Sequence, residues 1–147
     1  MVTINHECYV SLEVAKLLKE AGFDWEVNHS YPNISALDNS CSGYMEDLSF
    51  YHNLNDGKYG GLSVPTLEVV QKWLREVKHL DISIHYDPTI KSQPYVYFIY
   101  DVEEKFNDIL GIISPITHSY SDGYFYKYEE AQEEGIKKAL EIINKGE

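Results

Sequence analysis

The sequence predicts a single α+β domain over residues 1–147, built on a small antiparallel sheet of three or four strands that helices pack against. Two observations lead to this fold class. Three segments repeat apolar residues with the spacing of a helix, and between the second and third the spacing changes to the alternation of a strand. Residues 63–147 are therefore expected to follow the order α-β-β-β-α. Residues 1–62 are expected to add an N-terminal helix and an aromatic-rich irregular or hairpin segment.

The first two predicted helices cover residues 11–21 and 67–79. Ser11 is a suitable N-cap because its hydroxyl can accept from a free N–H of the first turn, and Gly22 suits a left-handed cap. In the second helix apolar residues recur at i, i+3, i+4 and i+7. The side chains that this spacing directs to the core are Leu67, Val70, Trp73, Leu74 and Val77.

The third predicted helix covers residues 128–144. Gly135 lies near its middle, where glycine costs about 1 kcal/mol relative to alanine. Gly135 forms a row of small residues with Ala131 and Ala139. We therefore expect another element to approach this helix closely.

The strands of the predicted sheet lie between the second and third helices. Leu80–Tyr86 alternates apolar and polar residues, and Asp87-Pro88 begins a turn. Pro94–Val102 and Ile109–Thr117 are the next two predicted strands, and Tyr124–Tyr126 is a candidate short fourth strand.

Residues 23–62 show neither the apolar spacing of a helix nor the alternation of a strand. A structureless loop of about 40 residues is implausible in a compact domain. Asn55-Asp56-Gly57 is a strong turn signal, which predicts a hairpin between Phe50–Leu54 and Lys58–Tyr59. We expect otherwise irregular structure here, held by the aromatic side chains of Trp25, Tyr31, Tyr44, Phe50 and Tyr59.

The net charge is −12, from 12 Lys and Arg against 24 Asp and Glu. Residues 1–62 hold 9 acids and 3 bases, and residues 63–147 hold 15 and 9, so neither part is basic. This charge argues against binding to nucleic acid or to an anionic membrane. With no long apolar run and no leader-like start, a cytoplasmic protein with Cys8 and Cys41 as free thiols is expected.

The residues that carry chemistry do not assemble into a recognised motif. His85 and Asp87 lie on the polar face of the first predicted strand. An imidazole beside a carboxylate is the pair that a small hydrolase would use as its general base. No nucleophile motif accompanies them. His6-Glu7-Cys8, with His29 or Cys41, lacks the spacing of a zinc site. We therefore predict no catalytic residue, no metal and no cofactor.

The 13 tyrosines are the unusual feature of the composition. Tyr95 and Tyr97, with Tyr124 and Tyr126, are candidates for one shared face of the sheet. Either a helix covers that face and the rings belong to the core, or the rings form a surface that binds a partner.

Residues 66–144 resemble double-stranded-RNA-binding domains in their order of elements. Those domains grip phosphate with lysines at the start of the last helix, where this chain has Tyr128-Glu129-Glu130 and only Lys127 is basic. The resemblance therefore implies a topology and does not support RNA binding.

A closer resemblance covers nearly the whole chain. The segments YVSLEVAKLLKEAGFD (9–24), VPTLEVVQKWLREVKHLDISI (64–84) and YKYEEAQEEGIKKALEIIN (126–144) resemble a family of short uncharacterised acidic proteins of gut anaerobic bacteria, their phages and mobile elements. The chain departs from the family pattern at Val70, where alanine is common, and at Lys127, where Ser or Thr is common. The family carries no established activity, so the resemblance implies an accessory protein of mobile DNA.

The function expected from these observations is non-enzymatic binding of a protein partner. The alternatives are an acidic mimic of nucleic acid that inhibits a host DNA-binding protein, and a small hydrolase that uses His85 and Asp87. The sequence leaves the oligomeric state open, and a dimer through a strand edge is compatible with so small a sheet.

Overall fold

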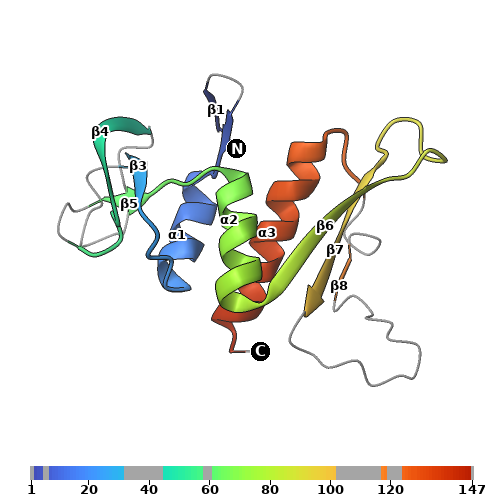
Figure 1. Ribbon diagram of the computed structural model, residues 1–147. Helices are drawn as coiled ribbons and strands as arrows, with labels where there is room; N and C mark the ends of the chain where they lie inside the picture. Colours follow the sequence, from blue (N-terminus) through green and yellow to red (C-terminus); the bar gives the residue numbers. More distant parts are fainter. Residues whose placement is uncertain are drawn as a thin grey trace. The chain divides into compact units, whose positions relative to one another are not determined.

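The computed structural model of the protein describes residues 2–4, 7–31, 45–57, 61–101, 117–118 and 124–146. Its fold is α+β with antiparallel sheets, as predicted (Figure 1). The chain forms two compact units. The first comprises Met1–Thr66 and Leu140–Glu147, and the second comprises Leu67–Ala139.

The first unit contains a hairpin, a helix and a small sheet. Its elements are β1 (Val2–Ile4), β2 (Glu7–Tyr9), α1 (Leu12–Glu20), β3 (Val27–Tyr31), β4 (Glu46–His52) and β5 (Leu62–Ser63). β1 and β2 pair as an antiparallel hairpin that the sequence did not predict. Within the described residues the other sheet has the order β4-β3-β5.

Helix α1 forms where its caps predict it. The Ser11 hydroxyl accepts from the N–H of Val14 at 3.4 Å, and Gly22 takes the left-handed conformation with φ +89°. Val14 and Leu18 are buried on the face that the apolar spacing indicated. The side-chain amide of Asn144 in the last turn of α3 (Tyr128–Asn144) donates to the carbonyl of Leu17 at 3.3 Å.

The prediction of irregular structure for residues 23–62 is wrong where the chain is described. β3 carries two buried polar residues, His29 and Ser30. Because these residues break the alternation of apolar and polar positions, the strand has no binary pattern to detect. Of the expected aromatic anchors, Tyr31 is buried whereas Phe50 is exposed. Tyr44 and Tyr59 lie outside the described residues.

The predicted turn at Asn55-Asp56-Gly57 is present, and the second strand of the hairpin predicted around it, Lys58–Tyr59, lies outside the described residues. Gly57 has φ +83°, and β4 before the turn pairs with β3. The side chain of Asn55 explains this path, because it donates to Phe23 O and accepts from Ser63 N, both at 3.0 Å. These bonds direct the chain to the other side of β3, where β5 pairs.

The second unit follows the predicted order. It contains α2 (Leu67–Trp73), η1 (Leu74–Lys78), β6 (Leu80–Tyr86), β7 (Tyr95–Asp101), β8 (Thr117–His118) and most of α3. The described strands form an antiparallel sheet of order β6-β7-β8. The predicted strand at 109–117 lies outside the described residues except at its end. At the candidate fourth strand, Phe125 forms an isolated bridge with Tyr95.

The second helix differs from its prediction in the last five residues. Leu74–Lys78 form a π-helix, η1, that ends at His79 in the left-handed conformation with φ +60°. A π turn holds more residues than an α turn. After Trp73, apolar residues spaced for an α-helix therefore no longer all fall on the buried face. Leu74 is still buried, but Val77 is 44% exposed, and its assignment to the core is wrong.

The close approach predicted at Gly135 is confirmed. A Cβ atom at this position would lie 2.9 Å from Cγ2 of Ile82 on β6 and 3.2 Å from Cγ of Tyr97 on β7. Gln132, one turn earlier, is buried and donates to Gln71 at 2.6 Å, and Gln71 donates to the carbonyl of Ile82 at 3.1 Å. α2 and α3 therefore pack side by side against β6 (Figure 1).

Candidate functional site

A group of tyrosines meets at one end of the second unit. We define the tyrosine surface as Tyr86, Tyr95, Tyr126 and Tyr128. Tyr86 and Tyr95 are directly opposite each other in the register of β6 and β7, and the turn beyond them is closed by a bond from Asp87 N to Pro94 O at 2.6 Å. Opposite residues of an antiparallel pair project from the same face, so both rings lie on one side.

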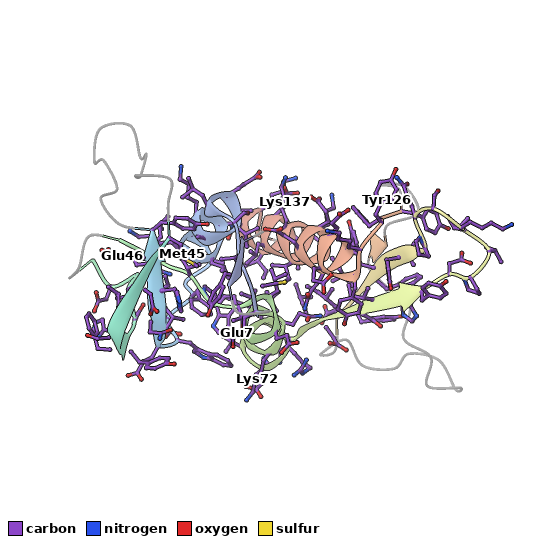
Figure 2. All side chains as sticks on the ribbon, turned by 90° about the horizontal axis from the view of Figure 1, so that it is seen from above. Glu7, Met45, Glu46, Lys72, Tyr126 and Lys137 are labelled. Atoms are coloured by element: carbon purple, nitrogen blue, oxygen red, sulfur yellow. The ribbon has the colours of Figure 1, made fainter. Side chains whose placement is uncertain are left out.

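Backbone pairing brings the other two tyrosines to the same place. Phe125 and Tyr95 exchange N–H···O bonds of 2.9 and 3.1 Å, which hold residues 125–128 beside the start of β7. Helix α3 begins at Tyr128. Figure 2 shows Tyr126 beside the start of that helix, at the edge of the unit.

The rings contact one another and remain open to solvent. Tyr86 and Tyr95 meet edge to face with centroids 5.6 Å apart, and Tyr95 and Tyr128 do so at 6.1 Å. Tyr86 is 63% exposed, Tyr126 62% and Tyr128 44%, while Tyr95 between them is half-buried. Large aromatic side chains with this exposure are typical of binding surfaces.

The four tyrosines named from the sequence do not all share this surface. Tyr97 is only 2% exposed, because α3 packs on it at Gly135, and it belongs to the core. Tyr124 is half-buried. The other two, Tyr95 and Tyr126, are members of the tyrosine surface.

Sequence reasoning missed Tyr86 and Tyr128. The signal for Tyr86 was available, because pairing the two predicted strands across a turn at residues 87–94 places it opposite Tyr95. Tyr128 was predicted as the first residue of the third helix, and only the Phe125 bridge brings it beside the strands. A local pattern cannot show such a contact.

Acidic residues directly follow two members of the tyrosine surface in the sequence, Asp87 after Tyr86 and Glu129 after Tyr128. The hydroxyl and the N–H of Thr89 donate to Asp87 at 2.6 and 2.9 Å, and these hydrogen bonds lower the pKa of Asp87. Glu129 and Glu130 occupy the first turn of α3. Lys91 and Lys127 are the neighbouring bases in the described segments 86–95 and 124–130.

The histidine of the predicted hydrolase lies on the opposite face of the same sheet. His85 is exposed, its Nε2 is 2.9 Å from the hydroxyl of Ser83, and its ring meets Phe98 edge to face at 4.8 Å. Asp87 makes its hydrogen bonds within its own turn, to Thr89. The pair His85 and Asp87 therefore lacks the contact by which a carboxylate would orient a catalytic imidazole.

A second polar cluster forms in the first unit. The ring of His29 stacks 4.4 Å from that of Tyr9, and its Nε2 is 3.7 Å from Asp47. Burial, and a 2.8 Å hydrogen bond that its hydroxyl donates to Glu7, raise the pKa of Tyr9 to about 12. In the part of the chain that the structure describes, no three His, Cys, Asp or Glu side chains are placed to hold a metal ion. His6 and Cys41 lie outside that part.

In comparisons with known proteins, no family model matches the chain, and no curated protein or solved structure is significantly similar to it. Among the described residues, no helix has the length and apolar character needed to cross a membrane. The function of the protein is therefore inferred from the geometry and charge of this chain.

Proposed function

We propose that the protein is a non-enzymatic binding protein that holds a partner protein at the tyrosine surface. The observation that carries this proposal is the exposure of three tyrosines that converge from β6, the turn before α3 and the start of α3. Aromatic side chains are enriched among the residues that dominate binding energy at interfaces. They bury a large area on binding and lose little conformational entropy.

The proposal also fits the charge of the chain. A net charge of −12 disfavours nucleic acid and an anionic membrane as partners. The resemblance to proteins of phages and mobile elements supports an accessory role in the cytoplasm of a bacterial host. A binding protein of this kind needs no cofactor.

Mimicry of nucleic acid receives less support. A mimic needs carboxylates in a row on one face, whereas the described helices carry lysines among their glutamates. Lys16 and Lys19 lie on α1, and Lys72 and Lys137 lie on α2 and α3 (Figure 2). The geometry gives a hydrolase no support, because Asp87 bonds to Thr89 and not to His85.

The proposal is tested by affinity capture from a lysate of the native host, with nuclease added. The baits are the unaltered protein, the double variant Tyr86→Ser/Tyr126→Ser and the control variant Tyr51→Ser. Tyr51 is a matched control because it is 67% exposed but lies on β4 in the first unit. We expect a stoichiometric protein that the unaltered bait and the control retain and the double variant loses. Retention of the same proteins by all three baits, or of none, would contradict the proposal.

A further inference from the structure

The exposed rings of the tyrosine surface present π faces as well as apolar area. Tyr86 and Tyr128 each contact Tyr95 in an edge-to-face arrangement, with interplanar angles of 67° and 84°. The face of an aromatic ring carries negative electrostatic potential, and a cation placed over it within about 6 Å is attracted. Because Tyr86 is 63% exposed and Tyr128 is 44% exposed, an incoming group can reach these rings.

The charge near the rings in the sequence favours a cationic group, since Asp87, Glu129 and Glu130 outnumber Lys91 and Lys127 in segments 86–95 and 124–130. Asp87 follows Tyr86 directly and stays ionised at neutral pH, since the hydrogen bonds from Thr89 stabilise its carboxylate. Glu129 and Glu130 follow Tyr128 directly. The whole chain carries −12, which attracts a cationic partner at long range and repels an anionic one.

We infer that the tyrosine surface binds an arginine-containing segment of the partner protein, an inference that rests on the proposed function. Guanidinium is planar and weakly hydrated, so it stacks on an aromatic face while its N–H groups donate to a neighbouring carboxylate. A lysine ammonium is more strongly hydrated and has no planar face to stack. Arginine therefore fits both the exposed rings and the acidic charge of the chain.

The test is a fluorescence-anisotropy titration of the full-length protein with a labelled peptide of alternating arginine and serine. Matched peptides replace every arginine by lysine or by citrulline, which keeps the shape of arginine without its charge. We expect the arginine peptide to bind about tenfold more tightly than the citrulline peptide, as cation–π contacts allow, and more tightly than the lysine peptide. Added salt is expected to weaken the binding.

Variants of one tyrosine separate a π contact from a merely apolar one. Tyr86→Phe keeps the ring and is expected to keep the binding, whereas Tyr86→Leu is expected to weaken it several-fold, within the range of a single cation–π contact. Tyr51→Leu, at an equally exposed ring in the first unit, is expected to leave it unchanged. Circular dichroism of each variant confirms that the fold is kept.

Three results would overturn the inference. They are equal binding of the citrulline peptide, equal weakening by Tyr51→Leu, and tighter binding of an uncharged proline-rich peptide than of the arginine peptide. The affinity capture separates this failure from that of the proposed function. A partner that is lost with Tyr86→Ser/Tyr126→Ser, while the arginine peptide does not bind, refutes the arginine segment and keeps the protein-binding role.

Discussion

Replacing Gly135 by alanine adds a single methyl group where α3 crosses β6 and β7. That Cβ would lie 2.9 Å from Cγ2 of Ile82, and 3.2 and 3.3 Å from Cγ and Cβ of Tyr97. Carbon atoms pack best at about 3.5–4.0 Å, so the closest pair overlaps by roughly half an ångström or more. Neither neighbour can move aside easily, because Ile82 is β-branched and the Tyr97 atoms are next to the backbone.

Two opposing terms decide the sign of the change. Alanine gains about 1 kcal/mol of helix propensity over glycine. Overpacking of a core typically costs about 1–3 kcal/mol. Because the contacts fall on stiff atoms, we expect the upper part of that range and a net loss of about 1–2 kcal/mol in the free energy of unfolding.

Urea unfolding followed by circular dichroism measures this loss. Ile82→Leu moves the branch from Cβ to Cγ and removes the closest contact, so in that background Gly135→Ala is expected to cost less. The difference between the two backgrounds is the coupling free energy of the pair. If Gly135→Ala instead stabilises the protein by the propensity gain alone, the close approach of α3 to the sheet is refuted.

Two further predictions concern Tyr9 and the π-helix. Because the pKa of Tyr9 is raised to about 12, the folded state holds its proton after the unfolded chain has lost it, and the free energy of unfolding should fall between pH 10 and 12 by up to about 2–3 kcal/mol. An NMR titration of labelled tyrosines checks this, with Tyr9→Phe assigning the signal, and a midpoint near pH 10 would contradict it. In η1, Val77→Ser should change the free energy of unfolding by less than about 0.5 kcal/mol, whereas Leu74→Ala should cost about 2–5 kcal/mol. Equal costs of the two substitutions in urea unfolding would show that the α-helix continues through residues 74–78, with Val77 on its buried face.

The helices of the second unit and its strands β6 and β7 were predicted with close boundaries because their sequences are locally consistent. Leu80–Tyr86 alternates without interruption, and α3 combines apolar periodicity with a row of small residues that predicted its contact with the sheet. Of the candidate site, Tyr95 and Tyr126 were recognised in advance. The sequence left open whether Tyr97 belongs to the core or to a binding surface, and its burial beneath α3 assigns it to the core.

The errors in the first unit share one cause, which is contact between residues distant in sequence. β3 has polar residues at buried positions, and His29 is held there by stacking on Tyr9 from β2. Asn55 directs the chain across β3 through bonds to Phe23 and Ser63. No local pattern encodes such contacts, so the sheet of the first unit was not predicted.

The sequence by itself determined the fold class, the caps of α1, the alternation of β6 and the acidic net charge. These features depend on neighbours along the chain and on composition, and local physical rules describe both. Only the tertiary structure decided which tyrosines are exposed. Burial depends on what packs over a ring, and here α3 covers Tyr97 while Tyr86 and Tyr126 stay open to solvent.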